Sequence, residues 1–518
     1  FLIVGTTLIA GFLTFLMRQT IIVMSRHIEF DLKNEIYDHY QKLSLDFYKR
    51  QRTGDLMSRI SEDVAKVRQY VGPAVMYSIN TLFRMAVVLI QMYIISPTLT
   101  WYSLIPVPFL AVLMYKLSKE VNTRSFAYQQ NLSKLSSFSQ EIFSGIRVIK
   151  AYTLEKKQSD AYDEATTESK TKFMRLAFTN ALIGPLMVLL IGISNILIVY
   201  IGAQMYINGV ITEIGIIAQF ILYINMLTWP IASLGWVSTM IQEAESSQKR
   251  INEFLNEAPS IQSNNEEIKV LNGKIEFNEV HFIYEDTKIH ALNNISFTIN
   301  KGETVAFLGK TGSGKSTILQ LISRMYDVSS GTILIDDVNI KEWNVQNLRD
   351  QIAVVPQDAF LFSDTIKNNI RFGKEDASQE EIEHFAKIAD VHKNIIRFDK
   401  GYETILGERG ITLSGGQKQR VSIARALIKD APALLLDDCL SAVDTETEEQ
   451  ILNNLKDIAD KKTTIIVTHR VSSAKNADKI IVLSEGTILE QGSHNQLINE
   501  NGYYANLYKK QLSEKDVK

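Results

Sequence analysis

The chain has 518 residues, of which 22% are charged, and a formal net charge of −3 at pH 7. A chain of this length is expected to form about three domains, and a slightly negative balance without a Lys/Arg-rich run argues against a nucleic-acid partner. The single cysteine, Cys439, excludes an internal disulfide framework and fits a reducing compartment.

Long apolar runs occupy the first half of the chain. Residues 1–25 carry one charge, Arg18, residues 70–115 carry only Arg84, and residues 176–212 carry none. A membrane interior is about 30 Å thick, and a helix of about 20 apolar residues spans it. We therefore predict a polytopic α-helical membrane domain over residues 1–255. Its expected spans are at about 1–25, 74–95, 99–116, 176–205 and 214–241.

The start of the chain is itself apolar. Phe1 lies inside an apolar run, with no initiator Met, no basic segment and no cleavage pattern of a signal peptide. We interpret this start as a truncation and expect one further span before it.

Charge in the connecting segments predicts the orientation. The two long connectors, at about 26–72 and 117–175, are rich in Lys and Arg, whereas the short connectors "ISPT" and "YINGVIT" have neither. By the positive-inside rule the long connectors and the second half are cytoplasmic, which makes the chain a multi-pass protein of the cell membrane. Apolar residues at helical spacing predict that the connectors form a helical stalk. Polar breaks at Gly54 and Gly145 would lie at the tips of this stalk, where a soluble domain could dock.

The second half has the pattern of an α/β domain. Residues 256–270 contain Pro259 and lack periodicity, which is typical of a linker. Between 271 and 512, short apolar strands such as "TVAFL", "ALLLD" and "TTIIVTH" alternate with helical segments. This alternation favours a mostly parallel sheet between helices. Residues 513–518 are expected to form a tail.

A glycine-rich loop indicates nucleotide binding. The segment "GKTGSGKST" follows the strand "TVAFL" and precedes a helical pattern, which is the strand–loop–helix context of a phosphate-binding loop. Its backbone N–H groups and the helix N-terminus favour phosphate, and we expect Lys315 to contact the β- and γ-phosphates. The residues expected around ATP are Gly309, Thr311, Gly312, Ser313, Gly314, Lys315, Ser316 and Thr317.

Two adjacent aspartates follow the strand "ALLLD". A carboxylate at the end of a buried strand is costly unless it is paired or binds a metal. Domains with a phosphate-binding loop place an acid at this position beside Mg²⁺. We therefore predict that Asp437 and the Ser316 hydroxyl bind Mg²⁺, with a structural ion pair of Asp437 as the alternative.

The order of the motifs resembles that of the ATP-binding cassette (ABC) family. "LSGGQ" lies between the phosphate-binding loop and "LLLDD", and it is accompanied by "VVPQD" and "VTHR". With the predicted spans, the whole chain resembles an exporter-type half-transporter. The resemblance implies ATP and Mg²⁺ as cofactors, a second half-transporter and membrane lipids as partners, and a small amphipathic substrate. It also implies that two cassettes enclose two nucleotides, and that the stalk tips near Gly54 and Gly145 act as coupling helices.

The resemblance also implies individual roles. Tyr284 would stack on adenine, Gln357 would link Mg²⁺ and the attacking water to the membrane domain, and His469 would contact the γ-phosphate. Asp444 and Glu408 would contact the other subunit, although Glu408 also fits an ordinary solvated loop. The residues that would contact ATP bound to the partner are Ser414, Gly415, Gly416 and Gln417.

Asp438 departs from the family pattern, in which most members have Glu. A carboxylate that is one methylene shorter retreats by about 1.5 Å, and a general base needs to be within hydrogen-bonding reach of its proton. Asp at this position resembles the degenerate-site subunit of heterodimeric multidrug exporters. We therefore expect the chain's own ATP site to turn over slowly beside a partner with Glu. The alternative is a homodimer in which Asp438 works after a small backbone shift.

The substrate path is predicted from polar residues within the spans. Arg84 lies mid-span, where a charge has to face the bundle interior or water, and the last span carries Gln219, Tyr223, Asn225 and Trp229. This mixed lining suits amphipathic organic compounds, although the same residues also serve helix packing.

The predicted function is ATP-driven export of such compounds. The alternatives are a lipid or peptide exporter and a nucleotide-gated channel or membrane regulator. The spans argue against a soluble cassette ATPase that acts on ribosomes or DNA.

Overall fold

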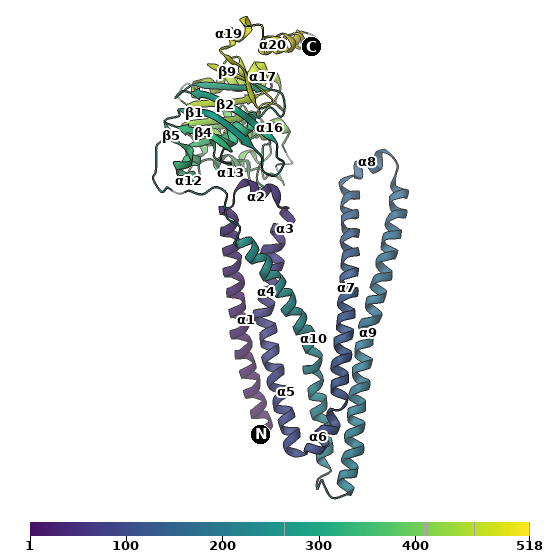
Figure 1. Ribbon diagram of the computed structural model, residues 1–518. Helices are drawn as coiled ribbons and strands as arrows, with labels where there is room; N and C mark the ends of the chain where they lie inside the picture. Colours follow the sequence, from purple (N-terminus) through teal and green to yellow (C-terminus); the bar gives the residue numbers. More distant parts are fainter. Residues whose placement is uncertain (264, 408–409, 411–412, 460–461, 517–518) are drawn as a thin grey trace. The chain divides into compact units, whose positions relative to one another are not determined.

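The described chain forms two compact units. A computed structural model describes residues 1–518 with the exception of 264, 408–409, 411–412, 460–461 and 517–518 (Figure 1). The helical unit consists of Phe1–Gln41 and Thr53–Glu257, and the α/β unit consists of Lys42–Arg52 and Ala258–Lys518. A short piece of the first long connector therefore belongs to the α/β unit.

The helical unit contains the predicted spans. Within the described chain, five helices are long and apolar enough to cross a membrane, which confirms the expected number. The helices are α1 (Leu2–Lys42), α3 (Thr53–Ser58), η1 (Arg59–Asp63), α4 (Val64–Gln69), η2 (Tyr70–Ala74), α5 (Val75–Ile95), α6 (Pro97–Leu104), α7 (Pro106–Ser144), α8 (Ile146–Ala151), α9 (Glu155–Ile207) and α10 (Gly215–Leu255).

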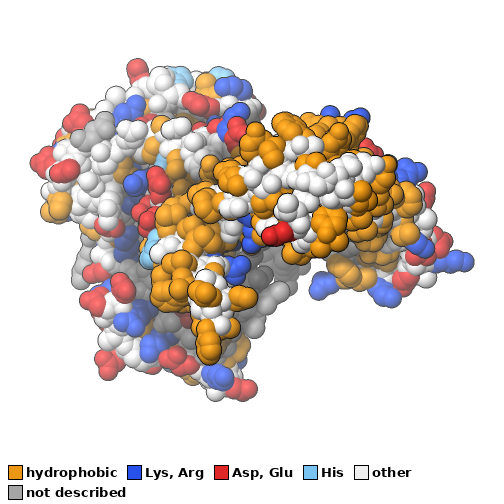
Figure 2. Space-filling model, turned by 90° about the horizontal axis from the view of Figure 1, so that it is seen from below, with side chains coloured by type: hydrophobic (Ala, Val, Ile, Leu, Met, Phe, Trp, Pro, Cys, Tyr) orange, Lys and Arg blue, Asp and Glu red, His pale blue; other side chains and the backbone are white. Residues whose placement is uncertain are grey.

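Many large apolar side chains are exposed on the outside of these helices. Phe83, Trp101 and Val188 are 72%, 71% and 72% exposed, and hydrophobic side chains cover much of the helical unit in Figure 2. Exposed apolar area of this extent is unfavourable in water and suits contact with lipid.

Pro106 interrupts the helix within the span predicted over 99–116, and Pro97–Ser144 remains one candidate span among the described residues. Ser96 caps α6 by accepting a hydrogen bond from the Leu99 N–H at 3.3 Å, and Pro97 occupies the first turn. A second break at Ile105 separates α6 from α7, because Pro106 has no N–H to donate to the preceding turn.

Polar contacts join η1 to α10. Asp63 of η1 is fully buried, accepts a hydrogen bond from Ser247 Oγ at 2.9 Å and pairs with Arg250 of α10. A buried carboxylate that lost these partners would be strongly destabilising. The pairing therefore fixes α10 against η1.

The α/β unit contains two sheets. The antiparallel sheet has the order β2-β1-β4-β5, and the larger sheet has the order β10-β9-β3-β8-β7-β6, in which all neighbours except β9 and β10 are parallel. The strands are β1 (Ile275–Ile283), β2 (His290–Ile299), β3 (Thr304–Gly309), β4 (Ser330–Ile335), β5 (Val338–Asn339), β6 (Ile352–Val355), β7 (Ala433–Asp437), β8 (Thr463–Thr468), β9 (Lys479–Ser484) and β10 (Thr487–Gly492).

Helices and short turns complete the α/β unit and cover the parallel strands. The sheet core includes the fully buried Phe307, Leu435 and Ile465, which confirms the predicted α/β class. The helices are α2 (Leu45–Arg50), α11 (Lys315–Ile322), η3 (Ile340–Glu342), α12 (Val345–Asp350), α13 (Ile366–Arg371), α14 (Gln379–Ile388), α15 (His392–Ile395), η4 (Gly401–Glu403), α16 (Gly415–Ile428), α17 (Thr445–Ala459), α18 (Val471–Ala474), α19 (His494–Asn499) and α20 (Tyr503–Asp516).

Candidate nucleotide-binding site

The parallel register of three strands creates the site. β3 pairs with β8 through Leu308 and Thr468, and β8 pairs with β7 through Val467 and Asp437. Parallel strands end at the same edge of a sheet, and ligands of such sheets bind at that edge. The loops that follow β3, β7 and β8 therefore meet there.

These loops line a cavity of 290 Å³. It brings together residues that are more than one hundred positions apart in the sequence. The predicted site residues in its wall are Tyr284, Thr311, Gly312, Gly314, Lys315, Ser316, Thr317, Gln357, Asp437, Asp438 and His469.

The phosphate-binding loop depends on its glycines. Gly312 and Gly314 have φ values of +84° and +95°, which side-chain-bearing residues rarely adopt. A Cβ on Gly314 would also collide with the carbonyl oxygen of Ala291. Of the other predicted loop residues, Gly309 ends β3 and Ser313 is buried, so their place in the structure is the base of the loop.

Lys315 lies inside this loop. Its Nζ donates hydrogen bonds to the carbonyl oxygens of Gly309 and Lys310 at 2.9 and 2.7 Å. Burial lowers the pKa of Lys315, and the nearby carboxylates of Asp438 and Asp437 act in the opposite direction. The loop thus holds a positive charge beside its backbone N–H groups, where a polyphosphate would be favoured.

Ser316 and Asp437 bring together two side-chain oxygen atoms of the kind that bind Mg²⁺. Ser316 Oγ donates a hydrogen bond to Asp437 Oδ1 at 2.8 Å. Burial raises the pKa of Asp437, while the hydrogen bond from Ser316 lowers it. No group of three His, Cys, Asp or Glu side chains suited to a metal occurs among the described residues. Mg²⁺ commonly uses one or two protein oxygens together with substrate phosphates and water, and this pair fits that requirement.

Asp438 faces His469. The two oxygens of the Asp438 carboxylate lie 3.0 and 3.1 Å from His469 Nδ1, so the shorter side chain still reaches the histidine. Asp438 has a φ of +43°, and its N–H donates to the Val467 carbonyl at 2.8 Å. Asp tolerates this left-handed backbone better than most residues.

Two contacts that the sequence motifs did not predict hold His469 in place. The neighbouring Arg470 donates to the buried Glu448 at 2.6 Å and to the Ser441 carbonyl at 2.9 Å. Gln511 of α20 donates to the His469 carbonyl at 3.1 Å and accepts from the Val471 N–H at 2.8 Å. For the first contact, the sequence signal was Arg470 itself, the charged residue within "VTHR". For the second contact there was no signal, because Gln511 lies in a helix without a recognisable motif.

Tyr284 is held at the edge of the cavity. Its hydroxyl lies 3.1 Å from Thr317 Oγ1 and donates to Gln320 Oε1 at 3.1 Å. Lys49 Nζ of α2 lies 4.6 Å from the centre of the Tyr284 ring and 5.0 Å from that of Tyr326. The polar break predicted near Gly54 thus follows a short helix that contacts the aromatic edge of the site.

The "LSGGQ" segment forms a helix N-terminus elsewhere in the α/β unit. Ser414 caps α16 and forms a reciprocal pair of hydrogen bonds with Gln417. Gly416 lies so close to the Ala442 carbonyl that a Cβ there would come within 2.9 Å of it. None of Ser414, Gly415, Gly416 and Gln417 lines the 290 Å³ cavity. Their contact with ATP bound to a partner stays a prediction.

Of the two residues predicted to contact the other subunit, only Asp444 is described, and its contact with a partner stays a prediction. Asp444 accepts a hydrogen bond from the Thr447 N–H at 2.9 Å, and this bond lowers the pKa of Asp444. Glu408 lies outside the described residues.

Comparison with known proteins identifies the family. Residues 1–231 match the ABC transporter transmembrane region and residues 292–441 match the ABC transporter family. The multidrug resistance-like ATP-binding protein MdlA of Escherichia coli (strain K12) is 38% identical over 516 residues, which cover 99% of this chain and 87% of MdlA. The chain is a member of the ABC transporter family.

Further similarities place it among the ABC exporters. The ATP-dependent lipid A-core flippase of Syntrophus aciditrophicus is 34% identical over 496 residues, which cover 95% of this chain and 82% of the flippase. A solved bacterial Atm1-family ABC exporter with ATP bound is 28% identical, with a TM-score of 0.80, and the match covers 94% of this chain and 86% of that structure. This ABC exporter half-transporter is thus a multi-pass membrane protein with an ATP-binding domain, and its activity is ATP-driven export.

Two of the predicted substrate-path residues contact each other, and the others have separate surroundings. Gln219 donates to the Tyr223 hydroxyl at 2.8 Å, and Asn225 donates to the Ile221 carbonyl of its own helix at 2.8 Å. Trp229 is 60% exposed, and Arg84 lies on the exposed side of α5. Their role in transport stays a prediction.

Proposed function

We propose that this chain is one half of a heterodimeric exporter that moves amphipathic organic molecules outward across the cell membrane. The supporting observation is the nucleotide cavity, which joins Lys315, the Ser316–Asp437 pair and His469. The described part of the same chain has five helices that are long and apolar enough to cross a membrane. The multidrug resistance-like MdlA is similar over nearly the whole chain, which supports amphipathic compounds as the substrate class.

The protein groups have complementary roles in this proposal. The phosphate-binding loop and Lys315 hold the phosphates of ATP, Ser316 and Asp437 hold Mg²⁺, which neutralises phosphate charge, and Tyr284 stacks on adenine. Gln357 and Asp438 lie in the wall of the cavity. Gln357 orients the attacking water, and Asp438 stands at the position of the general base. His469 stabilises charge on the γ-phosphate.

The position of Asp438 supports our assignment of this chain's own ATP site as the slower of the two sites. Both of its oxygens lie within hydrogen-bonding distance of one ring nitrogen of His469. A short carboxylate held in this way is poorly placed to accept a proton from water farther into the cavity, and loss of such help costs about 10²- to 10⁴-fold in rate. A partner with Glu at this position would hydrolyse ATP quickly, with "LSGGQ" of this chain completing its site.

Exposed apolar residues at the tip around α8 support the proposal that this chain binds a second half-transporter. Phe143 and Tyr152, which flank α8, are each 74% exposed, and Val148 within it is 58% exposed. This tip lies in a connector that is cytoplasmic by its charge, so lipid does not cover it. We assign it to docking on the nucleotide-binding domain of the second half-transporter.

Transport into inside-out vesicles tests the proposal. Vesicles that contain the chain and a candidate partner should accumulate a fluorescent amphipathic dye when ATP is added. Lys315→Ala, combined with the same change at the corresponding lysine of the partner, should abolish accumulation. ATP-dependent conductance without accumulation would instead indicate a nucleotide-gated channel.

Lipid export is the second candidate, and the similarity to the lipid A-core flippase favours it. Replacement of the dye by a fluorescent phospholipid in the same vesicles distinguishes the two. Movement of the lipid, with no movement of the dye, would indicate that the chain exports lipids.

A further inference from the structure

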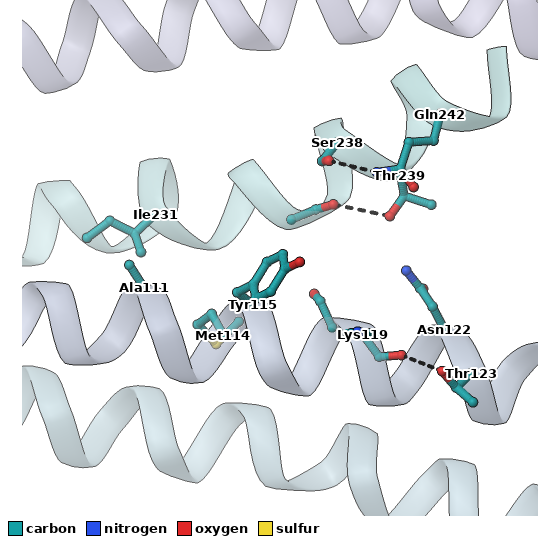
Figure 3. Close-up of a pocket in the computed structure, with 12 residues that line it drawn as sticks. Ala111, Met114, Tyr115, Lys119, Asn122, Thr123, Ile231, Ser238, Thr239 and Gln242 are labelled. Carbon is teal, nitrogen blue, oxygen red and sulfur yellow. Dashed lines mark hydrogen bonds between the residues drawn. The ribbon is translucent and has the colours of Figure 1, made fainter. Parts of the chain in front are cut away.

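A cavity of 560 Å³ lies between α7 and α10 in the helical unit (Figure 3). The two helices approach closely at Gly235, where an added Cβ would come within 2.9 Å of Ser118 Oγ. From α7, Tyr115 and Asn122 point toward α10. None of the residues proposed for the substrate path from the sequence lines this cavity.

The lining changes from apolar to polar along the helices. One end is formed by Ala111, Met114 and Ile231, and the other includes Asn122 and Gln242. The twelve steps from residue 111 to residue 123 on α7 correspond to about 18 Å of helix. The polar end lies toward the connector of α7 that is cytoplasmic by its charge. The cavity thus suits an elongated molecule with its apolar part toward the membrane and its polar part toward the cytoplasm.

The polar end has an unbalanced positive charge. Lys119 is the only charged residue among those that line the cavity, and it has no salt-bridge partner within the described residues. The adjacent Glu120 pairs with Arg124 at 2.7 Å. Around Lys119, the side chains of Ser118, Asn122, Ser238, Thr239 and Gln242 supply neutral hydrogen-bonding groups.

We propose that this cavity binds an amphipathic molecule with an anionic head group, which Lys119 recognises. The inference rests on the proposed function, because it names the charge class of the exported molecule. A carboxylate, phosphate or sulfate head gains an ion pair and neutral hydrogen bonds at the polar end, while a hydrocarbon body covers Met114 and Ile231. A cationic head would meet Lys119 with no acidic residue in the lining to compensate. Anionic lipids and soluble anionic amphiphiles share this chemistry.

Direct binding tests the proposal without ATP. The full chain in phosphatidylcholine nanodiscs is titrated with dansyl-labelled undecanoic acid and with its methyl ester, and binding is followed by dansyl fluorescence. The acid should bind about three- to fivefold more tightly than the ester. Lys119→Ala should remove that preference, and Lys119→Arg should keep it.

Two further variants locate the probe. Lys116→Ala removes a charge from the same helix outside the cavity lining and should keep the preference for the acid. Ala111→Trp fills the apolar end and should weaken binding of both probes. Equal affinity of the native chain for acid and ester, or equal loss in Lys116→Ala and Lys119→Ala, would overturn the proposal.

Nanodiscs that contain phosphatidylglycerol identify the source of the ligand. Suppressed probe binding in these nanodiscs supports an anionic membrane lipid as the occupant, and undiminished binding supports a soluble anionic amphiphile. Because binding is measured without nucleotide, a failure of the export assay and a failure of anion recognition give separate results.

Discussion

The nucleotide cavity and the cavity between α7 and α10 are built from different kinds of backbone. The first is formed by loops at the ends of three paired strands, where Gly312 and Gly314 adopt left-handed conformations and Lys315 bonds to its own loop. The second is formed by the faces of two long helices that approach at Gly235. Hydrogen bonds and register fix each position in the loops, whereas the helix faces offer a broad surface of replaceable side chains. Single substitutions should therefore have large effects in the first cavity and modest ones in the second.

The largest expected effect is that of Lys315→Ala. It removes the charge that the phosphate-binding loop holds, and we expect ATP hydrolysis by the assembled transporter to fall by about 100-fold if the partner site also carries the change. Lys301→Ala, in the exposed turn before β3, is the matched control and should leave hydrolysis unchanged. Retention of most activity when both sites carry the change would show that the cavity is not the site of hydrolysis.

Arg470→Ala should have the next largest effect, on stability. It leaves Glu448, whose side chain is 1% exposed, without its cationic partner. Loss of one member of such a pair costs about 3 kcal/mol, which thermal unfolding of the α/β unit should report. Lys462→Ala breaks the pair with Asp430, whose side chain is 79% exposed, and should shift unfolding very little. Equal shifts in the two variants would argue against a structural role of Arg470.

Ser414→Ala separates helix capping from nucleotide contact. Ser414 and Ser378 each form a reciprocal capping pair, at α16 and α14. Loss of either cap should cost about 1 kcal/mol of stability. If α16 contacts ATP bound to the partner, only Ser414→Ala should also slow hydrolysis at the partner's site. Equal hydrolysis by the two variants would contradict this assignment.

Lys49→Met should have the smallest effect. It removes the cation over the rings of Tyr284 and Tyr326, a contact that contributes about 0.5–1 kcal/mol. If Tyr284 stacks on adenine, ATP should bind a few-fold more weakly while tripolyphosphate binds as before. Lys42→Met serves as the control. Equal weakening of both ligands would show that Lys49 acts on the phosphates instead.

The sequence predicted the nucleotide site better than the membrane cavity for a physical reason. Phosphate binding needs glycines, a lysine and a hydroxyl at fixed spacing, so "GKTGSGKST" and "LLLDD" are visible without a structure. The structure places Lys315, Asp437 and His469 in one cavity, as the order of parallel strands requires. Gln511 and Glu448 could not be predicted, because their contacts with the His469 loop depend on how distant helices fold back.

The α7–α10 cavity could not be predicted, because composition does not reveal which helix faces meet. Polar residues in the last span suggested Tyr223 and Asn225, yet Tyr223 accepts from Gln219 and Asn225 bonds to its own helix. The cavity instead depends on Gly235 and on residues of α7 that lie partly in the span predicted over 99–116 and partly in the connector that follows it. The span predicted over 99–116 lies within the candidate span Pro97–Ser144. The interruption at Ile105 was not predicted, because Pro106 also fits the first turn of a helix.

ATP turnover by Asp438→Glu tests the central claim most directly. In the purified chain, with no partner present, the native protein should bind ATP but hydrolyse it slowly. Asp438→Glu should raise turnover by about tenfold or more, because the longer carboxylate reaches water beyond His469. Asp438→Asn should give no increase. Rapid turnover by the native chain, unchanged in Asp438→Glu, would contradict the slow-site assignment and favour a homodimer.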